Sequence, residues 1–158
     1  MGLILNEGTK RVLKSVGLSS STVLTEKVAP ALQPWAALTC KGVDTFGSSV
    51  EHLLRKYNKD IIHEQFLLNR LANSAIDIFI MMAVLSRASR AVNKNLPMAQ
   101  HEVNLASVIC SEAGERVHHN LNNLRSSASL SNFKLMKNIS QEIFSADGVA
   151  HRHPIDRL

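Results

Sequence analysis

The stretch AIDIFIMMAVL, Ala75–Leu85, decides the fold of this chain. It lies within a longer pattern, about Ile61 to Val92, whose apolar residues recur with the period of an α-helix. The stretch is apolar on nearly every side, which is typical of a helix with neighbours on several sides. We therefore expect a long central helix in which Asp77 needs a partner. Arg87 and Arg90, one turn apart near its end, are placed to clamp a carboxylate on a neighbouring helix.

Further helices are expected on both sides of the central one. Their approximate bounds are Pro34–Tyr57, Met98–Leu124 and Asn132–Phe144. The interrupting segments are YNKD (Tyr57–Asp60), NKNLP (Asn93–Pro97) and RSSASLS (Arg125–Ser131). Short connections between long helices favour antiparallel neighbours. The predicted fold class is therefore all-α: an antiparallel helical bundle with a long central helix, preceded by a short amphipathic helix.

That amphipathic helix is expected from about Leu3 to Ser15. Its apolar stripe lies opposite lysine and arginine side chains, and the serine-rich spacer Leu18–Thr22 follows. The pattern is typical of a helix in a membrane interface, of a mitochondrial transit peptide, and of an ordinary core helix. In the membrane interpretation, the contact residues are Leu5, Lys10, Arg11, Val12, Leu13, Lys14 and Val16.

Composition narrows the class of protein. The 158 residues form one domain with a net charge of +5, but they include one Trp, one Tyr and no Lys/Arg run longer than two. This argues against a nucleic-acid partner. The most apolar run, Ile78–Leu85, is far shorter than the ~20 residues a bilayer requires, so no transmembrane helix is expected. Cys40 and Cys110 lack CxxC spacing and are expected to be reduced core thiols.

Metal and catalytic motifs are incomplete. His63-Glu64 and His101-Glu102 lack the second histidine of a zinc protease motif. Glu115 and His118 form one Glu-x-x-His, whereas a di-iron bundle needs two such pairs. No glycine-rich phosphate loop or GxSxG turn is present. We therefore expect no metal-binding and no catalytic residue.

Residues 63–106 carry a resemblance to a known family. HEQFLLNRLANSAIDIFIMMAVLSRASRA (His63–Ala91), followed by AQHEVNLA (Ala99–Ala106), resembles the C-terminal domain of very-long-chain acyl-CoA dehydrogenase. It is similar as well to the same domain of a close relative, the acyl-CoA dehydrogenase that acts as a complex I assembly factor. The very-long-chain enzyme is favoured by the stretches EQFLLNRLA and AID. The assembly-factor relative is favoured by the ending HPIDR (His153–Arg157). The resemblance is most specific from Asp44 to Leu124 and covers nearly the whole chain.

The resemblance also bears on Glu7-Gly8-Thr9, which imitates the motif that carries the catalytic base of flavin-dependent acyl-CoA dehydrogenases. Residues 2–20 align with a family segment that follows the true motif and attaches the enzyme to the inner mitochondrial membrane. Glu7 lies on the charged face of the expected helix, whereas such a base needs a dry pocket beside the flavin. No catalytic or FAD-binding residue is therefore expected here. FAD is the cofactor of the parent family, and the chain alone is expected to be inactive.

The resemblance implies a C-terminal accessory domain, a fragment of a mitochondrial very-long-chain-type acyl-CoA dehydrogenase of fatty-acid β-oxidation. Residues 1–33 would be an amphipathic, membrane-associating segment and linker, the bundle 34–144 would pack against the catalytic domains, and 145–158 would form a C-terminal tail. The implied partners are those catalytic domains, an anionic membrane surface and a second copy in a homodimer. The implied location is peripheral, on the matrix side of the inner membrane. The alternative is a free-standing, non-enzymatic helical adaptor in respiratory-chain (complex I) assembly.

Overall fold

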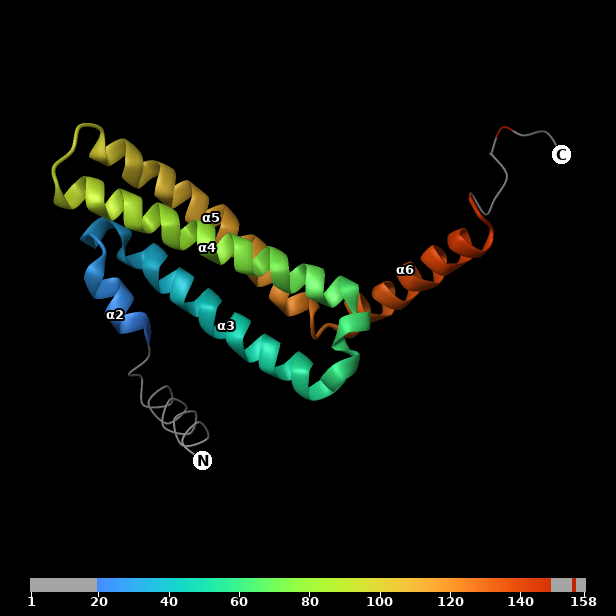
Figure 1. Cartoon of the computed structure of the whole chain (residues 1–158). Helices are drawn as coiled ribbons and strands as arrows, with labels where there is room; N and C mark the ends of the chain where they lie inside the picture. The colour runs from blue at the N-terminus through green and yellow to red at the C-terminus, as the bar shows by residue number, and fades with distance from the viewer. Residues whose placement is uncertain (1–19, 149–154, 156–158) are drawn as a thin grey trace, which may run out of the picture. The chain divides into compact units, whose positions relative to one another are not determined.

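The computed structural model describes residues 20–148 and residue 155, and in this part of the chain every regular element is helical (Figure 1). In chain order the elements are α2 Ser20–Lys27, the 3-10 helix η1 Pro30–Leu32, α3 Gln33–Tyr57, the 3-10 helix η2 Asn58–His63, α4 Gln65–Asn93, α5 Ala99–Asn123 and α6 Ser127–Ser145. The predicted all-α class and the long central helix, α4, are confirmed. The predicted amphipathic helix lies outside the described residues.

The chain divides into two compact units, with the boundary between Leu121 and Asn122. The first unit contains α2 to α4 and α5 as far as Leu121, and the second contains the last two residues of α5 and α6. The predicted domain bounds at 1–33, 34–144 and 145–158 stay predictions.

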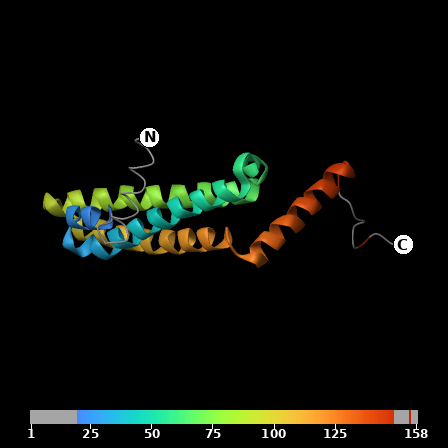
Figure 2. The same ribbon diagram turned by 90° about the horizontal axis from the view of Figure 1, so that it is seen from below.

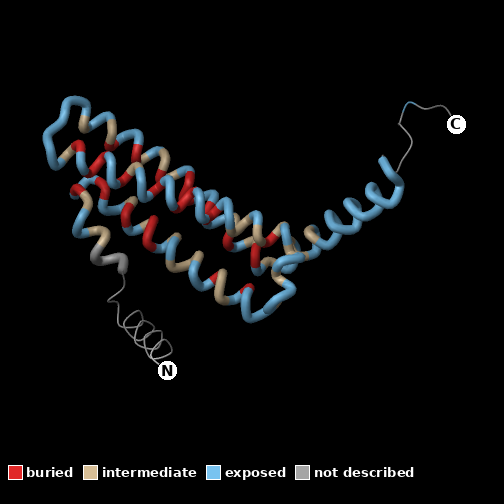
Figure 3. The backbone as a smooth tube through the Cα atoms, viewed as in Figure 1, coloured by how far each residue is buried: buried red, intermediate tan, exposed pale blue. Residues whose placement is uncertain are grey.

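In the first unit, α3, α4 and α5 lie side by side with alternating chain direction (Figures 1 and 2). Their buried residues line the inner sides of the helices (Figure 3). The central cluster consists of Ala29, Leu32, Ala36, Met81, Leu85, Ala88, Val103, Ala106, Cys110 and Ala113. Small residues are frequent in it, which lets the helix backbones approach closely. Cys40 and Cys110 are buried free thiols, as predicted.

Two asparagines with unusual backbone geometry lie within the breaks that the sequence predicts. Asn58, after α3, and Asn95, between α4 and α5, both have a φ of 48°. Asparagine enters this left-handed region more readily than other residues with a side chain. Both residues lie in connections at which the chain reverses direction between antiparallel helices.

The start of α6 differs from the prediction. The helix begins at Ser127, inside the segment expected to be a linker, rather than near Asn132. The reason is a helix cap: the Ser126 hydroxyl oxygen accepts a hydrogen bond from the Ser129 N–H at 3.4 Å. Similarly, α2 begins at Ser20, inside the serine-rich segment expected to be a spacer.

Close helix contact explains one glycine in the bundle. A Cβ atom on Gly114 of α5 would lie 2.7 Å from Cδ2 of Leu38 on α3. The missing side chain therefore lets Leu38 pack directly against the α5 backbone.

Candidate docking surface

Two ion pairs join α4 to α5. Arg116 Nη2 lies 2.7 Å from Asp77 Oδ1, and Arg116 Nε lies 3.2 Å from each carboxylate oxygen. Arg87 donates to both oxygens of Glu102, at 2.9 and 2.7 Å. The predictions that Asp77 needs a partner and that Arg87 clamps a carboxylate on a neighbouring helix are confirmed.

The pairs alter the proton affinity of their members. Hydrogen bonding to Asp77 raises the pKa of Arg116, and hydrogen bonding to Glu102 raises the pKa of Arg87. The hydrogen bonds from Arg87 lower the pKa of Glu102. Because two-pronged pairing restricts geometry as well as adding energy, the two pairs fix the register of α4 against α5.

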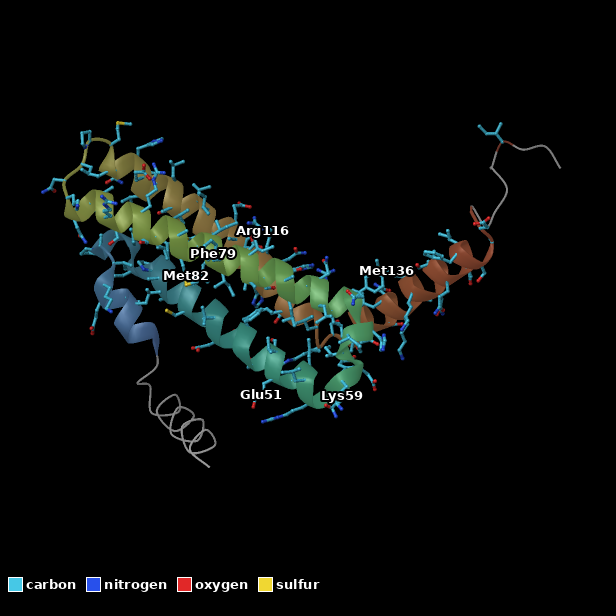
Figure 4. The ribbon with its side chains drawn as sticks, viewed as in Figure 1. Glu51, Lys59, Phe79, Met82, Arg116 and Met136 are labelled. Atoms are coloured by element: carbon cyan, nitrogen blue, oxygen red, sulfur yellow. The ribbon has the colours of Figure 1, made fainter. Side chains whose placement is uncertain are left out.

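The same two helices also carry large apolar side chains that are exposed. Ile76 and Phe79 of α4 are 57% and 68% exposed, and α5 adds Leu105 and Val108. We use the name α4/α5 face for the exposed apolar residues of the two helices taken together, among which Phe79, two residues after Asp77, lies on the side of α4 away from α5: Ile76, Phe79, Ile80, Leu105 and Val108. Figure 4 labels Phe79 on α4 and Arg116 on α5.

Helix geometry places Ile76 and Ile80 on the side of α4 that faces away from α3. Ile78 packs toward Gly42 of α3, where its Cγ1 would lie 3.6 Å from an added Cβ atom. On an α-helix, side chains two positions apart point in directions that differ by about 200°, so Ile76 and Ile80 point away from the direction of Ile78. Ile76 and Ile80 therefore face outward, and no described element of the first unit buries them.

The sequence interpretation did not identify this face. The apolar pattern in Ala75–Leu85 predicts neighbours on several sides of the helix, but α3 and α5 bury only part of its surface. The apolar pattern on all sides of this helix was the sign of the α4/α5 face in the sequence. An apolar helix surface that is not covered within its own domain indicates a partner outside that domain.

By its length and composition alone, α4 could cross a membrane. This differs from the sequence prediction that no transmembrane helix is present, which relied on the short apolar run Ile78–Leu85. The helix spans Gln65–Asn93, and 39% of its apolar window is buried within the structure. The core helix of a soluble protein can have the same length and composition, so these two properties are weak support for a membrane-spanning helix. Asp77 is mostly buried against Arg116 of α5, which fits a helix packed within protein.

The residues predicted to contact a membrane lie outside the described part of the chain. They are Leu5, Lys10, Arg11, Val12, Leu13, Lys14 and Val16. Glu7 also lies outside it. Among residues 20–148, no group of three or more His, Cys, Asp or Glu side chains is arranged to hold a metal ion. Glu115 and His118 instead line a pocket of about 210 Å³ between α3 and α5.

Comparison with known proteins identifies relatives over almost the whole chain. The family described as "ACAD9/ACADV, C-terminal domain" matches residues 30–149. Very long-chain specific acyl-CoA dehydrogenase, mitochondrial, is 39% identical in Bos taurus over 155 residues, 37% in Homo sapiens over 155 and 36% in Mus musculus over 156. Each match covers 98% of this chain and 24% of the relative. The chain thus spans about a quarter of their length.

Proposed function

The chain belongs to the ACAD9/ACADV C-terminal domain family, and from that premise we propose that it is the helical accessory part of a mitochondrial very-long-chain-type acyl-CoA dehydrogenase. In this proposal the bundle packs against the catalytic domains through the α4/α5 face. FAD and the catalytic base belong to those domains, within the three quarters of the relatives' length that this chain does not match. The reaction of the whole enzyme belongs to fatty-acid β-oxidation.

The exposed α4/α5 face is the observation that carries the proposal. Exposed apolar surface of this kind marks interaction sites when several such side chains gather on one part of a protein. Full burial of one large apolar side chain contributes about 1.5–3 kcal/mol. Covering Ile76 and Phe79, which are more than half exposed, therefore contributes roughly 2–3 kcal/mol.

Membrane attachment is a further part of the proposal. The segment Leu3–Leu18 would lie in the surface of an anionic membrane, with Leu5, Val12 and Leu13 among its apolar contacts and Lys10 and Lys14 among its basic ones. A homodimer would double this weak contact and strengthen binding through multivalency. The location would be peripheral, on the matrix side of the inner mitochondrial membrane.

Docking is tested by mixing the chain with a recombinant bovine relative that lacks its matched C-terminal quarter, and measuring complex formation by size-exclusion chromatography with light scattering. We expect a complex that Phe79→Asp disrupts. Leu54→Asp is the matched control, because Leu54 is an exposed apolar residue on α3. A complex that withstands Phe79→Asp refutes docking through the α4/α5 face. Failure of the unsubstituted chain to form a complex favours the alternative, a free-standing adaptor in respiratory-chain assembly.

Membrane attachment is tested separately by cosedimentation with cardiolipin-containing liposomes. We expect binding that weakens in high salt and with Leu13→Asp. Binding that is insensitive to both changes contradicts attachment through residues 3–18.

A further inference from the structure

A separate pocket lies between α2 and the C-terminal part of α4, with a volume of about 410 Å³. Part of its wall is apolar: Leu24 and Val28 come from α2 and the residues after it, and Met82, labelled in Figure 4, comes from α4. Another part is basic and consists of Lys27, Arg90 and Lys94. No carboxylate is among the described residues that line it.

The three cations have no anionic partner within residues 20–148. None of the ion pairs in this part of the chain includes Lys27, Arg90 or Lys94. The sequence prediction of a carboxylate clamp therefore holds for Arg87 and is wrong for Arg90. Arg90 also differs from every other described arginine, since those form hydrogen bonds or other interactions: Arg55, Arg70, Arg87, Arg116 and Arg125.

A buried hydrogen bond holds the two sides of the pocket together. The N–H of Ala29, just after α2, donates to the hydroxyl oxygen of Ser89 on α4 at 2.9 Å. Ser89 is 5% exposed, so water competes little for this bond. The bond fixes the end of α2, with Lys27, beside the turn of α4 that carries Arg90.

The positions of the cations at helix ends have a simpler partial explanation. Lys27 is the last residue of α2 and Lys94 directly follows α4. Cations at such ends offset the helix dipole. The helix dipole accounts for one cation at the end of α2 and one at the end of α4. It does not account for three cations in one pocket that has an apolar wall and no carboxylate.

We propose that this pocket binds the phosphate group of an anionic amphiphile. Phosphate oxygens accept hydrogen bonds from Lys27, Arg90 and Lys94, and the adjoining alkyl chain lies along Leu24, Val28 and Met82. Arginine and lysine are the usual phosphate-binding side chains, arginine as a fork and lysine as a point charge. The phosphate has two sources with the same chemistry, a soluble alkyl phosphate or the headgroup of a phospholipid.

The test is isothermal titration of the full chain with inorganic phosphate and with dodecyl phosphate below its micelle concentration. We expect dodecyl phosphate to bind at least tenfold more tightly than inorganic phosphate. The double variant Arg90→Gln, Lys94→Gln is expected to weaken binding of both probes at least tenfold. Its matched control is Lys56→Gln, Lys59→Gln, which removes the same charge from the last turn of α3 and from η2, where Figure 4 labels Lys59. Neither lysine lines the pocket, so this variant is expected to bind like the unsubstituted chain. Circular dichroism verifies that each variant is folded.

The apolar wall has its own variant. Met82→Gln is expected to weaken dodecyl phosphate severalfold and to leave inorganic phosphate unchanged. The proposal is overturned when the two double variants bind dodecyl phosphate equally, or when dodecyl phosphate binds no more tightly than inorganic phosphate.

The source of the phosphate is identified with vesicles of phosphatidylcholine, with and without phosphatidic acid. A phospholipid source predicts that phosphatidic acid increases binding and that the Arg90→Gln, Lys94→Gln chain loses the increase while the control variant keeps it. A soluble source predicts the same response to dodecyl phosphate, with vesicle binding equal in the two double variants.

Discussion

Asp77 of α4 and Arg116 of α5 form a two-pronged ion pair in which the two partners differ in exposure. The Asp77 side chain is 11% exposed and that of Arg116 is 53% exposed. The carboxylate therefore depends on the pair for its hydrogen bonds, whereas the guanidinium also reaches water. This asymmetry leads to a prediction about which partner costs more to remove.

Arg116→Met is expected to lower the free energy of unfolding by about 2–4 kcal/mol, because it leaves a mostly buried carboxylate unpaired. Asp77→Asn is expected to cost less, about 1–2 kcal/mol, because the amide oxygen still accepts from Arg116. Urea unfolding followed by circular dichroism measures both values. Equal costs, or a larger cost for Asp77→Asn, would show that the pair is not asymmetric.

The pair between Arg87 and Glu102 predicts a pH dependence. Hydrogen bonding from Arg87 lowers the pKa of Glu102 below its usual 4.5. A lowered pKa in the folded state means that the stabilisation is present above pH 4.5 and is lost as the pH falls through the folded-state value.

The check is the melting temperature of the unsubstituted chain and of Glu102→Gln between pH 3 and pH 7. We expect the unsubstituted chain to melt higher at pH 7, with the difference disappearing at the acid end. Because Arg87 is largely exposed, 0.5 M NaCl is expected to reduce the difference at pH 7. A difference that grows toward acid pH contradicts the assignment.

Gly114 and Gly47 form a matched pair of helical glycines. Nothing lies within 4 Å of a Cβ atom added at Gly47, whereas Gly114 has Leu38 at 2.7 Å. Gly47→Ala is expected to stabilise the fold by about 0.5–1 kcal/mol through helix propensity. Gly114→Ala gains the same propensity but must displace Leu38, so it is expected to be less stable than Gly47→Ala. Chemical denaturation of both variants tests this, and the reverse order would argue against close packing of α3 on α5.

The thiols predict slow chemical modification. Burial raises the pKa of Cys110 to about 11 and also raises that of Cys40, with a further contribution from Asp44. At pH 8 the Cys110 thiolate fraction is then about one in a thousand, and the side chain is fully enclosed. Iodoacetamide labelling followed by mass spectrometry is expected to modify Cys40 before Cys110, and both far more slowly than in urea. Rapid labelling of native Cys110 would contradict this core.

Much of the fold was predictable because its signals are local. Helical spacing identified α3, α4 and α5, and the asparagine-containing breaks near Asn58 and Asn95 separated them. The starts of α2 and α6 were missed because serine occurs both in linkers and at helix caps. The role of Ser126 as a helix cap is evident only from the hydrogen bond that its hydroxyl oxygen accepts from the Ser129 N–H, and this bond depends on the backbone geometry.

The docking surface was less predictable because burial depends on distant neighbours. The pattern in Ala75–Leu85 predicted contacts around the helix, but periodicity does not say whether α3, α5 or another protein supplies them. Arg87 and Arg90 show the same limit. Both lie near the end of α4, yet only Arg87 meets a carboxylate, because Glu102 lies across from it on α5.

The most direct measurement of the central claim, that the α4/α5 face docks on the catalytic domains, is hydroxyl-radical footprinting read by mass spectrometry. The chain is labelled alone and with the bovine relative that lacks its C-terminal quarter. The account predicts that oxidation of Phe79 and Leu105 falls severalfold on mixing while that of Leu54 on α3 stays unchanged. Protection of Leu54 with Phe79 still freely oxidised would contradict it.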